Sequence, residues 1–292
     1  MSLSRLVQRR TGALGAFSIA ALLCTALALP QDRPPSGERK PVGGADTQAP
    51  AQHANLPSAQ EVLKKYVEAT GGEEAYKKFT SQHLVGKFSM PAMGMEGTFE
   101  LFKKGSDKML AVINLPGMGE IRNGLNGKTG WRTDPMQGPR LVQGEELNTV
   151  LRDSDLQAPI RPEQHYSDMT VQGVEEVNGE QAYHVVLTPK TSGRPINVWY
   201  SVDSGLMLKS AASQETEMGV VEFESVVSDY KEAEGDVKIK LPHKITTAGG
   251  GVEYVITLDK VEVNAQIPDD RFELPPDVKQ LLEQQPAEKQ QM

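Results

Sequence analysis

From about residue 82 to residue 263, apolar and polar positions alternate along most of the chain. Successive side chains of a β-strand point to opposite faces of a sheet, so a period of two predicts strands with one apolar and one wetter face. The clearest examples place an apolar side chain at every second position: Phe99 and Leu101, Val221 and Phe223, and Tyr254, Ile256 and Leu258. The main body of the chain is therefore predicted to be β-rich.

Short turn signals separate these strand-like segments. Asn126-Gly127 and Asn178-Gly179 each lie between two of them, and so do Asp203-Ser204-Gly205 and Glu234-Gly235-Asp236. Two-residue Asn-Gly loops favour hairpins because both residues can take positive φ, which matches the twist of the strands. Strands joined in this way are antiparallel neighbours. The pattern predicts ten or eleven strands in one antiparallel sheet.

A helical pattern precedes the strands. Ser58 is a good helix N-cap, and Glu61 follows three residues later to complete a capping box. The apolar spacing predicts a helix that ends at Gly71-Gly72, then a short helix over 73–79 and, between strands, an amphipathic helix over 144–153. The predicted fold class is α+β, mainly β: one large curved antiparallel sheet with a few helices packed on one side.

The start of the chain has the pattern of an export signal. Three arginines precede an uncharged apolar stretch over 12–29, in which Ala26-Leu27-Ala28 places small residues where a signal peptidase cuts. We predict a signal peptide over 1–28, with an uncleaved anchor and a twin-arginine signal as alternatives. Each reading places everything after Pro30 outside the cytoplasm.

The remaining chain divides by composition. Residues 29–56 are rich in proline and glycine with few large apolar side chains, which predicts a disordered linker. The segment 57–283 is long enough to form a single domain with its own core. Residues 284–292 are polar and are predicted to be a disordered tail.

Cysteine content and charge exclude several classes of function. Cys24 is the single cysteine of the chain, and it lies in the predicted signal. If it is removed with the signal, disulfides, thiol catalysis and cysteine-ligated zinc are excluded; acylation of Cys24 as a lipoprotein anchor is the alternative. The formal net charge is −8, which argues against nucleic acid as a partner.

The sequence carries no pattern typical of catalysis. The five histidines lie far apart, and no Gly-x-Ser-x-Gly motif or phosphate-binding glycine loop occurs. Pairs of acidic residues such as Glu145-Glu146 and Asp269-Asp270 lie at predicted helix starts or turns, where a solvated surface explains them. We therefore predict no catalytic residues, no metal ligands, no cofactor and a protein that is not an enzyme; a hydrolase is the least favoured alternative.

Apolar side chains on the predicted strands are better candidates for a binding site. The alternation places large ones on one face of the sheet, and we expect both tryptophans to face the covered side with the others. Six of the eleven methionines fall between residues 90 and 136, where they either adapt a pocket to apolar ligands or fill gaps in the core. The candidate ligand-binding residues are Phe88, Phe99, Leu101, Trp131, Trp199, Phe223, Tyr254 and Ile256.

Several short motifs together resemble a known family. Over about residues 56–278, the chain is similar to exported bacterial proteins of the LolA/LolB-like superfamily, the outer-membrane lipoprotein-sorting or lipoprotein-carrier proteins. The motifs that carry the resemblance are Ala69-Thr70-Gly71-Gly72, Asn126-Gly127-Lys128 with Trp131, Gly144-Glu145-Glu146-Leu147, Asp203-Ser204-Gly205-Leu206, Asp229-Tyr230 and Phe272-Glu273-Leu274-Pro275.

The resemblance implies a fold and a function. It implies a half-open barrel of about eleven antiparallel strands, with helices that close the concave side and acyl chains bound within it. The expected protein is a non-catalytic component of the periplasm or cell envelope that binds a lipid or a lipoprotein acyl chain and serves in outer-membrane lipoprotein sorting. Relatives joined to peptidases suggest the alternative, an interaction domain for an envelope protein partner that binds no small ligand.

Overall fold

The computed structural model of the protein describes residues 56–191, 194–216 and 219–284. The predicted signal over 1–28, nearly all of the predicted linker over 29–56 and the predicted tail lie outside the described residues, so these domain boundaries stay predictions.

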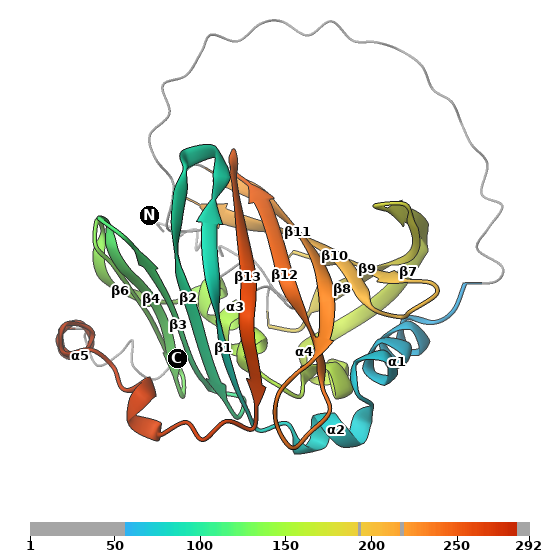
Figure 1. The fold of residues 1–292 in the computed structure, drawn as a ribbon, viewed down its shortest axis with the longest axis horizontal. Coiled ribbons are helices and arrows are strands. Elements are labelled where there is room, and N and C mark those ends of the chain that lie inside the picture. The colour runs from blue at the N-terminus through green and yellow to red at the C-terminus, as the bar shows by residue number, and fades with distance from the viewer. Residues whose placement is uncertain (1–55, 192–193, 217–218, 285–292) are drawn as a thin grey trace, which may run out of the picture.

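A single open antiparallel sheet dominates the described part of the chain (Figure 1). Its thirteen strands follow the order β6-β5-β4-β3-β2-β1-β13-β12-β11-β10-β9-β8-β7. This confirms the predicted fold class, although the sheet has more than the ten or eleven strands predicted. The first and last strands pair with each other at the middle of the sheet. The strands are β1 Ser81–Met90, β2 Met95–Lys104, β3 Lys108–Leu115, β4 Gly119–Asn126, β5 Thr129–Asp134, β6 Gly138–Val142, β7 Tyr166–Val177, β8 Glu180–Pro189, β9 Ile196–Ser201, β10 Met207–Thr216, β11 Gly219–Glu232, β12 Lys240–Gly249 and β13 Val252–Val263.

The predicted hairpins form where the turn residues indicated. Asn178 and Gly179 both have positive φ, 53° and 85°, in the turn between β7 and β8. In the turn between β4 and β5, the residue with positive φ is Gly127, at 61°. Strand β6 lacks the alternating pattern and contains Pro139, which an edge strand tolerates because its outer N–H groups need no partner strand.

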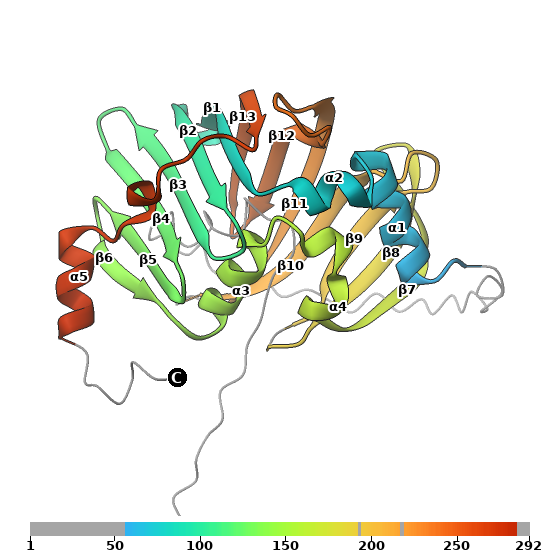
Figure 2. The ribbon, with the colours of Figure 1, turned by 90° about the horizontal axis from the view of Figure 1, so that it is seen from below.

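The three predicted helices begin close to the predicted residues, and the described part of the chain has two further helices that were not predicted. The helices are α1 Ala59–Thr70, α2 Glu73–Lys78, α3 Gly144–Ser154, α4 Pro162–His165 and α5 Pro276–Glu283, with single 3₁₀ turns η3 Pro91–Met93, η4 Ala158–Ile160 and η5 Asp269–Phe272. The capping box of α1 is present: the Glu61 backbone N–H donates to Ser58 Oγ at 3.3 Å, and the Ser58 N–H donates to Glu61 Oε2 at 2.7 Å. Figure 2 shows α3 and α4 inside the curve of the sheet, α1 and α2 along one rim, and α5 beyond edge strand β6.

Replacing the N-cap tests the start of the domain. Ser58→Ala removes the hydroxyl that accepts from the Glu61 N–H, and we expect a loss of about 1 kcal/mol in the free energy of unfolding. Ser58→Asp, which keeps an accepting oxygen at the same position, is the control and should retain most of the stability. Denaturant unfolding followed by far-UV circular dichroism measures both. Equal losses in the two variants would show that the cap contributes nothing.

Apolar side chains cover both faces of the sheet, in separate clusters. The largest cluster contains side chains from both halves of the sheet together with α1, α2 and α3. We call the face of the sheet that carries it the inner face. On the opposite, outer face, one cluster joins β2, β3 and β5 to η5 and α5, and another lies on β8, β9 and β10 with the end of β7.

One glycine of β4 makes room for the outer cluster. A Cβ at Gly124 would lie 2.1 Å from Cε2 of Trp131, so the indole lies directly on the backbone of its neighbouring strand. Gly124→Ala should therefore lower the free energy of unfolding by about 1–3 kcal/mol. Gly173→Ala is the matched control, because nothing lies within 4 Å of a Cβ built there. Thermal and denaturant unfolding measure the stability of both variants, and equal stabilities would contradict this packing.

Candidate functional site

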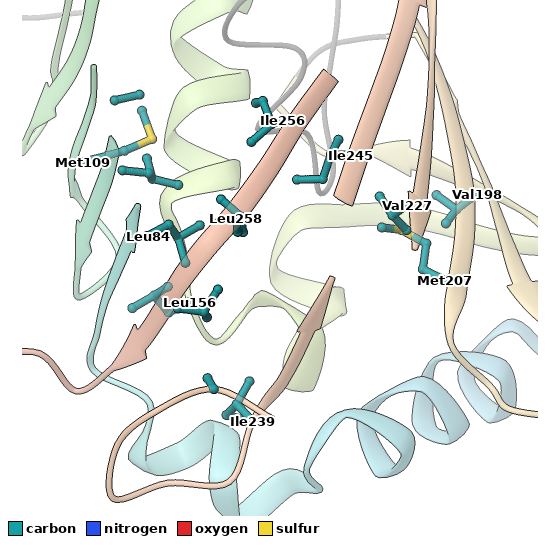
Figure 3. Close-up of a cluster of buried hydrophobic side chains, with 14 of the residues drawn as sticks. Leu84, Met109, Leu156, Val198, Met207, Val227, Ile239, Ile245, Ile256 and Leu258 are labelled. Carbon is teal, nitrogen blue, oxygen red and sulfur yellow. The ribbon is translucent and has the colours of Figure 1, made fainter. Parts of the chain in front are cut away.

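Five of the predicted ligand-binding residues meet on the inner face. Phe88, Phe99, Leu101, Tyr254 and Ile256 all belong to the largest apolar cluster, and each is at most 4% exposed. Pairing across strands brings them together, because Phe88 lies opposite Ile256. The rings of Phe88 and Tyr254 stack with their centroids 5.6 Å apart. Figure 3 shows side chains of the same cluster from Leu84 and Met109 in one half of the sheet to Val198 and Met207 in the other.

Phe223 lies nearer the end of the inner face. It is half-buried on β11 and pairs with Gly249 of β12. A Cβ at Gly249 would lie 2.1 Å from the Phe223 ring, so the ring lies over the β12 backbone. Four residues further along β11, Val227 belongs to the largest apolar cluster, so Phe223 shares the inner face with it.

The two tryptophans lie on the outer face, which corrects the expectation that they face the same side as the others. Trp131 belongs to the cluster that η5 and α5 cover, and Trp199 belongs to the cluster on β8 to β10. Val198 and Tyr200, the neighbours of Trp199, belong to the inner cluster. Since neighbouring side chains of a strand point to opposite faces, the tryptophans contact neither the inner cluster nor a ligand bound there.

Helices contribute few fully buried side chains to the inner cluster. From α1 come Ala59, Val62, Leu63, Tyr66 and Val67, from α2 Tyr76 and from α3 Val150. The ring of Tyr66 lies 5.3 Å from that of Tyr200 on β9. Two further apolar residues of α3, Leu147 and Leu151, pack against the cluster while partly exposed. The strands therefore supply most of this apolar surface.

Some of the methionines fill the core and others are exposed. Met90 and Met109 are fully buried in the inner cluster and fill the core. Met93, Met118 and Met136 are 44%, 39% and 70% exposed in the turns after β1, β3 and β5. Because these turns join strands at the same end of the sheet, the exposed methionines lie along one rim. A small pocket of about 10 Å³ there is lined by Leu115, Met118, Gly119, Ile121, Asp134, Pro135 and Met136.

A charged network lies at the end of α3. Nζ of Lys103 donates to the backbone oxygen of Asp153 at 2.6 Å. Asp155 accepts from Arg161 Nη2 at 2.6 Å and has its other oxygen 2.7 Å from Nε2 of His165. These residues join β2, α3 and α4. The sequence did not single them out, because charges on a short amphipathic helix are typical of a solvated face.

The pKa values of two carboxyl groups in this network are shifted in opposite directions, although burial raises both. For Asp153, burial outweighs the nearby cations Arg152, Lys103 and His165 and raises the pKa to about 6. For Asp155, burial is outweighed by the hydrogen bonds from His165 and Arg161, which lower the pKa to about 2. The pKa of Lys103 is lowered, mainly by burial.

Histidines and acids of the described residues do not gather into a metal site. Within residues 56–191, 194–216 and 219–284, no group of three His, Cys, Asp or Glu side chains is placed to hold a metal ion. His83 and His184 instead stack on Phe102 and Trp199, at 4.4 and 4.5 Å between ring centroids. Within the same ranges, no helix is long and apolar enough to cross a membrane; the apolar stretch over 12–29 lies outside them.

Comparison with known proteins supports the fold. No protein-family model matches the chain, and no curated protein matches it in sequence. Among solved structures, a LolA superfamily protein from Nitrosomonas europaea is 16% identical, with a TM-score of 0.50 over 75% of this chain and 99% of that one. A DUF1329 family protein from Desulfovibrio piger is 14% identical, with a TM-score of 0.49 over 74% of this chain and 97% of that one. The resemblance predicted from the sequence is thereby confirmed for the fold: the chain has a LolA-like open curved sheet.

Proposed function

We propose that this is an exported, non-catalytic protein of the cell envelope that holds a lipid or a lipoprotein acyl chain on the inner face of its sheet. The observation that carries the proposal is the continuous apolar inner face, built mostly by strands and only sparsely by helices. Outer-membrane lipoprotein sorting is the specific role that the resemblance suggests.

An acyl chain is a suitable occupant of such a surface. Each buried methylene contributes about 0.8 kcal/mol, so a chain of ordinary length gains enough to offset the cost of ordering it. The described inner side chains include flexible and aromatic groups, Met109, Phe88 and Phe99, which adapt to alkyl chains of different length.

Adding bulk to the inner face tests the proposal. Ala111 on β3 belongs to the inner cluster, and Ala211 on β10 belongs to an outer cluster; they are 3% and 4% exposed. A phenylalanine at 111 would occupy volume that we assign to the acyl chain. We therefore expect Ala111→Phe to reduce co-purified lipid severalfold, as measured by mass spectrometry of the intact protein.

The matched variant Ala211→Phe overpacks a face that binds no ligand. It should lower the free energy of unfolding by about 1–3 kcal/mol and leave the lipid content per folded molecule unchanged. If the wild-type protein carries no lipid and takes up none, and both variants are equally destabilised, then the inner face is an ordinary core. In that case a stoichiometric protein partner recovered from envelope extract would favour the alternative, an interaction domain without a small ligand.

A further inference from the structure

Five polar residues gather where α3 meets the inner face, and we call them the polar cluster. They are Lys103 of β2, Arg152 and Asp153 of α3, Tyr166 of β7 and Tyr200 of β9. Lys103 contacts the Asp153 backbone. Arg152 and Asp153 both lie close enough to Tyr166 to influence its pKa, which burial raises, and Tyr166 in turn influences the pKa of Tyr200.

The polar cluster adjoins the apolar surface directly. Tyr166 and Tyr200 belong to the inner apolar cluster themselves, as do Val150 and Leu156 on either side of Arg152 and Asp153. Lys103 lies on β2 two residues after Leu101, on the same face of the strand. An acyl chain on the inner face would therefore have buried charge at one end of its site.

Several atoms of the polar cluster are buried with no hydrogen-bond partner among the described residues. They are Nε and Nη1 of Arg152, both carboxylate oxygens of Asp153 and the hydroxyl of Tyr200. The three side chains belong to residues that are 5%, 9% and 0% exposed. A buried polar atom without a partner destabilises the folded protein, and more so when it is charged. Four of these atoms belong to two adjacent residues of α3, and we infer that another molecule supplies the partners that they lack.

Two arginines close to α3, Arg140 and Arg161, do not have this property. Arg140 makes two hydrogen bonds to Glu146, at 2.6 and 2.7 Å, and Arg161 makes two to Asp155. A cation near the end of a helix stabilises the helix dipole, but an exposed side chain does so without losing its hydration. The helix terminus alone therefore does not explain why the Arg152 guanidinium is buried and incompletely bonded.

We propose that the polar cluster binds the head group of a phospholipid whose acyl chains lie on the inner face. The Arg152 guanidinium and the Tyr200 hydroxyl would donate to phosphate oxygens, with Lys103 adding positive charge. The Asp153 carboxylate would accept from an amine or hydroxyl at the far end of the head group. The inference rests on the proposed acyl-chain function and specifies the chemical class of its ligand.

The test compares lipids that differ only in the head group. Full-length protein is delipidated and loaded with a neutral fluorescent apolar probe, which is then displaced by phosphatidylethanolamine, phosphatidylglycerol or diacylglycerol with identical acyl chains. We expect the wild-type protein to bind either phospholipid at least about tenfold more tightly than diacylglycerol, the size typical of one charge-assisted hydrogen bond. Arg152→Gln should abolish this preference while diacylglycerol affinity stays within about twofold.

Two further variants keep the result interpretable. Arg140→Gln also removes an arginine that contacts α3, but one already bonded to Glu146, and it should leave the head-group preference intact. Tyr200→Phe removes one unpartnered hydroxyl without changing charge. It should weaken phospholipid binding severalfold, and it keeps the test possible if Arg152→Gln does not fold.

Equal affinity of the wild-type protein for all three lipids, or an unchanged preference in both Arg152→Gln and Tyr200→Phe, would overturn the head-group site but not the acyl site. Failure to bind either the probe or any lipid would overturn both.

Discussion

At pH 7, delipidated Asp153→Asn protein should be more stable than the wild-type protein by about 1–3 kcal/mol, and the difference should disappear near pH 4. Burial raises the pKa of Asp153 from 3.8 to about 6, and each unit of difference from the unfolded state corresponds to about 1.4 kcal/mol. Asparagine matches the shape of the protonated acid and carries no charge at any pH, so the substitution removes the cost of ionising a buried group.

The sign of this effect follows from proton binding. Between pH 3.8 and about 6 the folded protein holds a proton on Asp153 that the unfolded chain has lost, so wild-type stability falls as the pH rises through this window. The charged groups that surround the carboxyl, Lys103, Arg152 and His165, reduce the shift but do not reverse it. Asp155, whose pKa is lowered to about 2, has the opposite sign and loses its stabilising contribution only below pH 3.8.

Denaturant unfolding at pH 4, 5, 6 and 7 measures the effect. The wild-type and Asp153→Asn curves should converge at low pH and separate as the pH rises. Asp155→Asn is the control, because it removes the carboxylate that Arg161 and His165 contact and should destabilise the protein at pH 7. A stability difference between wild type and Asp153→Asn that does not change from pH 4 to pH 7 would contradict the burial of an ionising Asp153 side chain.

Truncating Trp131 should lower the free energy of unfolding by about 3–5 kcal/mol, the range for a large aromatic side chain removed from a packed core. The indole is 2% exposed and shares its cluster with Phe102, Phe272 and Val278. Trp131→Ala would leave a cavity between the sheet and the segment that contains η5 and α5. Because this cavity lies on the outer face, lipid content per folded molecule should not change.

Phe99→Ala provides the comparison on the inner face. Phe99 is fully buried in the inner cluster, but under the proposed function a bound acyl chain can move into the vacated space. The loss of stability should therefore be smaller in the lipid-loaded protein than in the delipidated one, whereas Trp131→Ala should cost the same in both states. Chemical unfolding with and without added lipid measures the four values. If added lipid reduced the stability loss of Trp131→Ala as much as that of Phe99→Ala, the separation of the two faces would be contradicted.

Local patterns predicted much of the fold because they act over short distances. The capping box at Ser58 and the Asn178-Gly179 turn each depend on a few neighbouring residues, and both form as predicted. The five inner-face residues from Phe88 to Ile256 follow from alternation along individual strands. The pairing of β1 with β13 has no such local signal, since it joins segments separated by most of the domain.

Other features of the structure could not be predicted from the sequence, and the reasons are physical. Strand β9 carries apolar side chains on both faces, because an outer cluster covers Trp199 while Val198 and Tyr200 face inward. Alternation alone cannot tell which face a tryptophan takes when both are covered. Arg152 and Asp153 follow each other on a short helix, where charge normally indicates solvent, and only the three-dimensional arrangement buries them.

The pairing of the first strand with the last also has a consequence for the order of events during synthesis. Neither half of the sheet can gain its central neighbour until the segment that forms β13 has left the ribosome, because β13 joins β1 on one side and β12 on the other. Contacts so distant in sequence form slowly. The complete sheet would thus form only when translation is nearly complete, which is compatible with the export proposed for this protein.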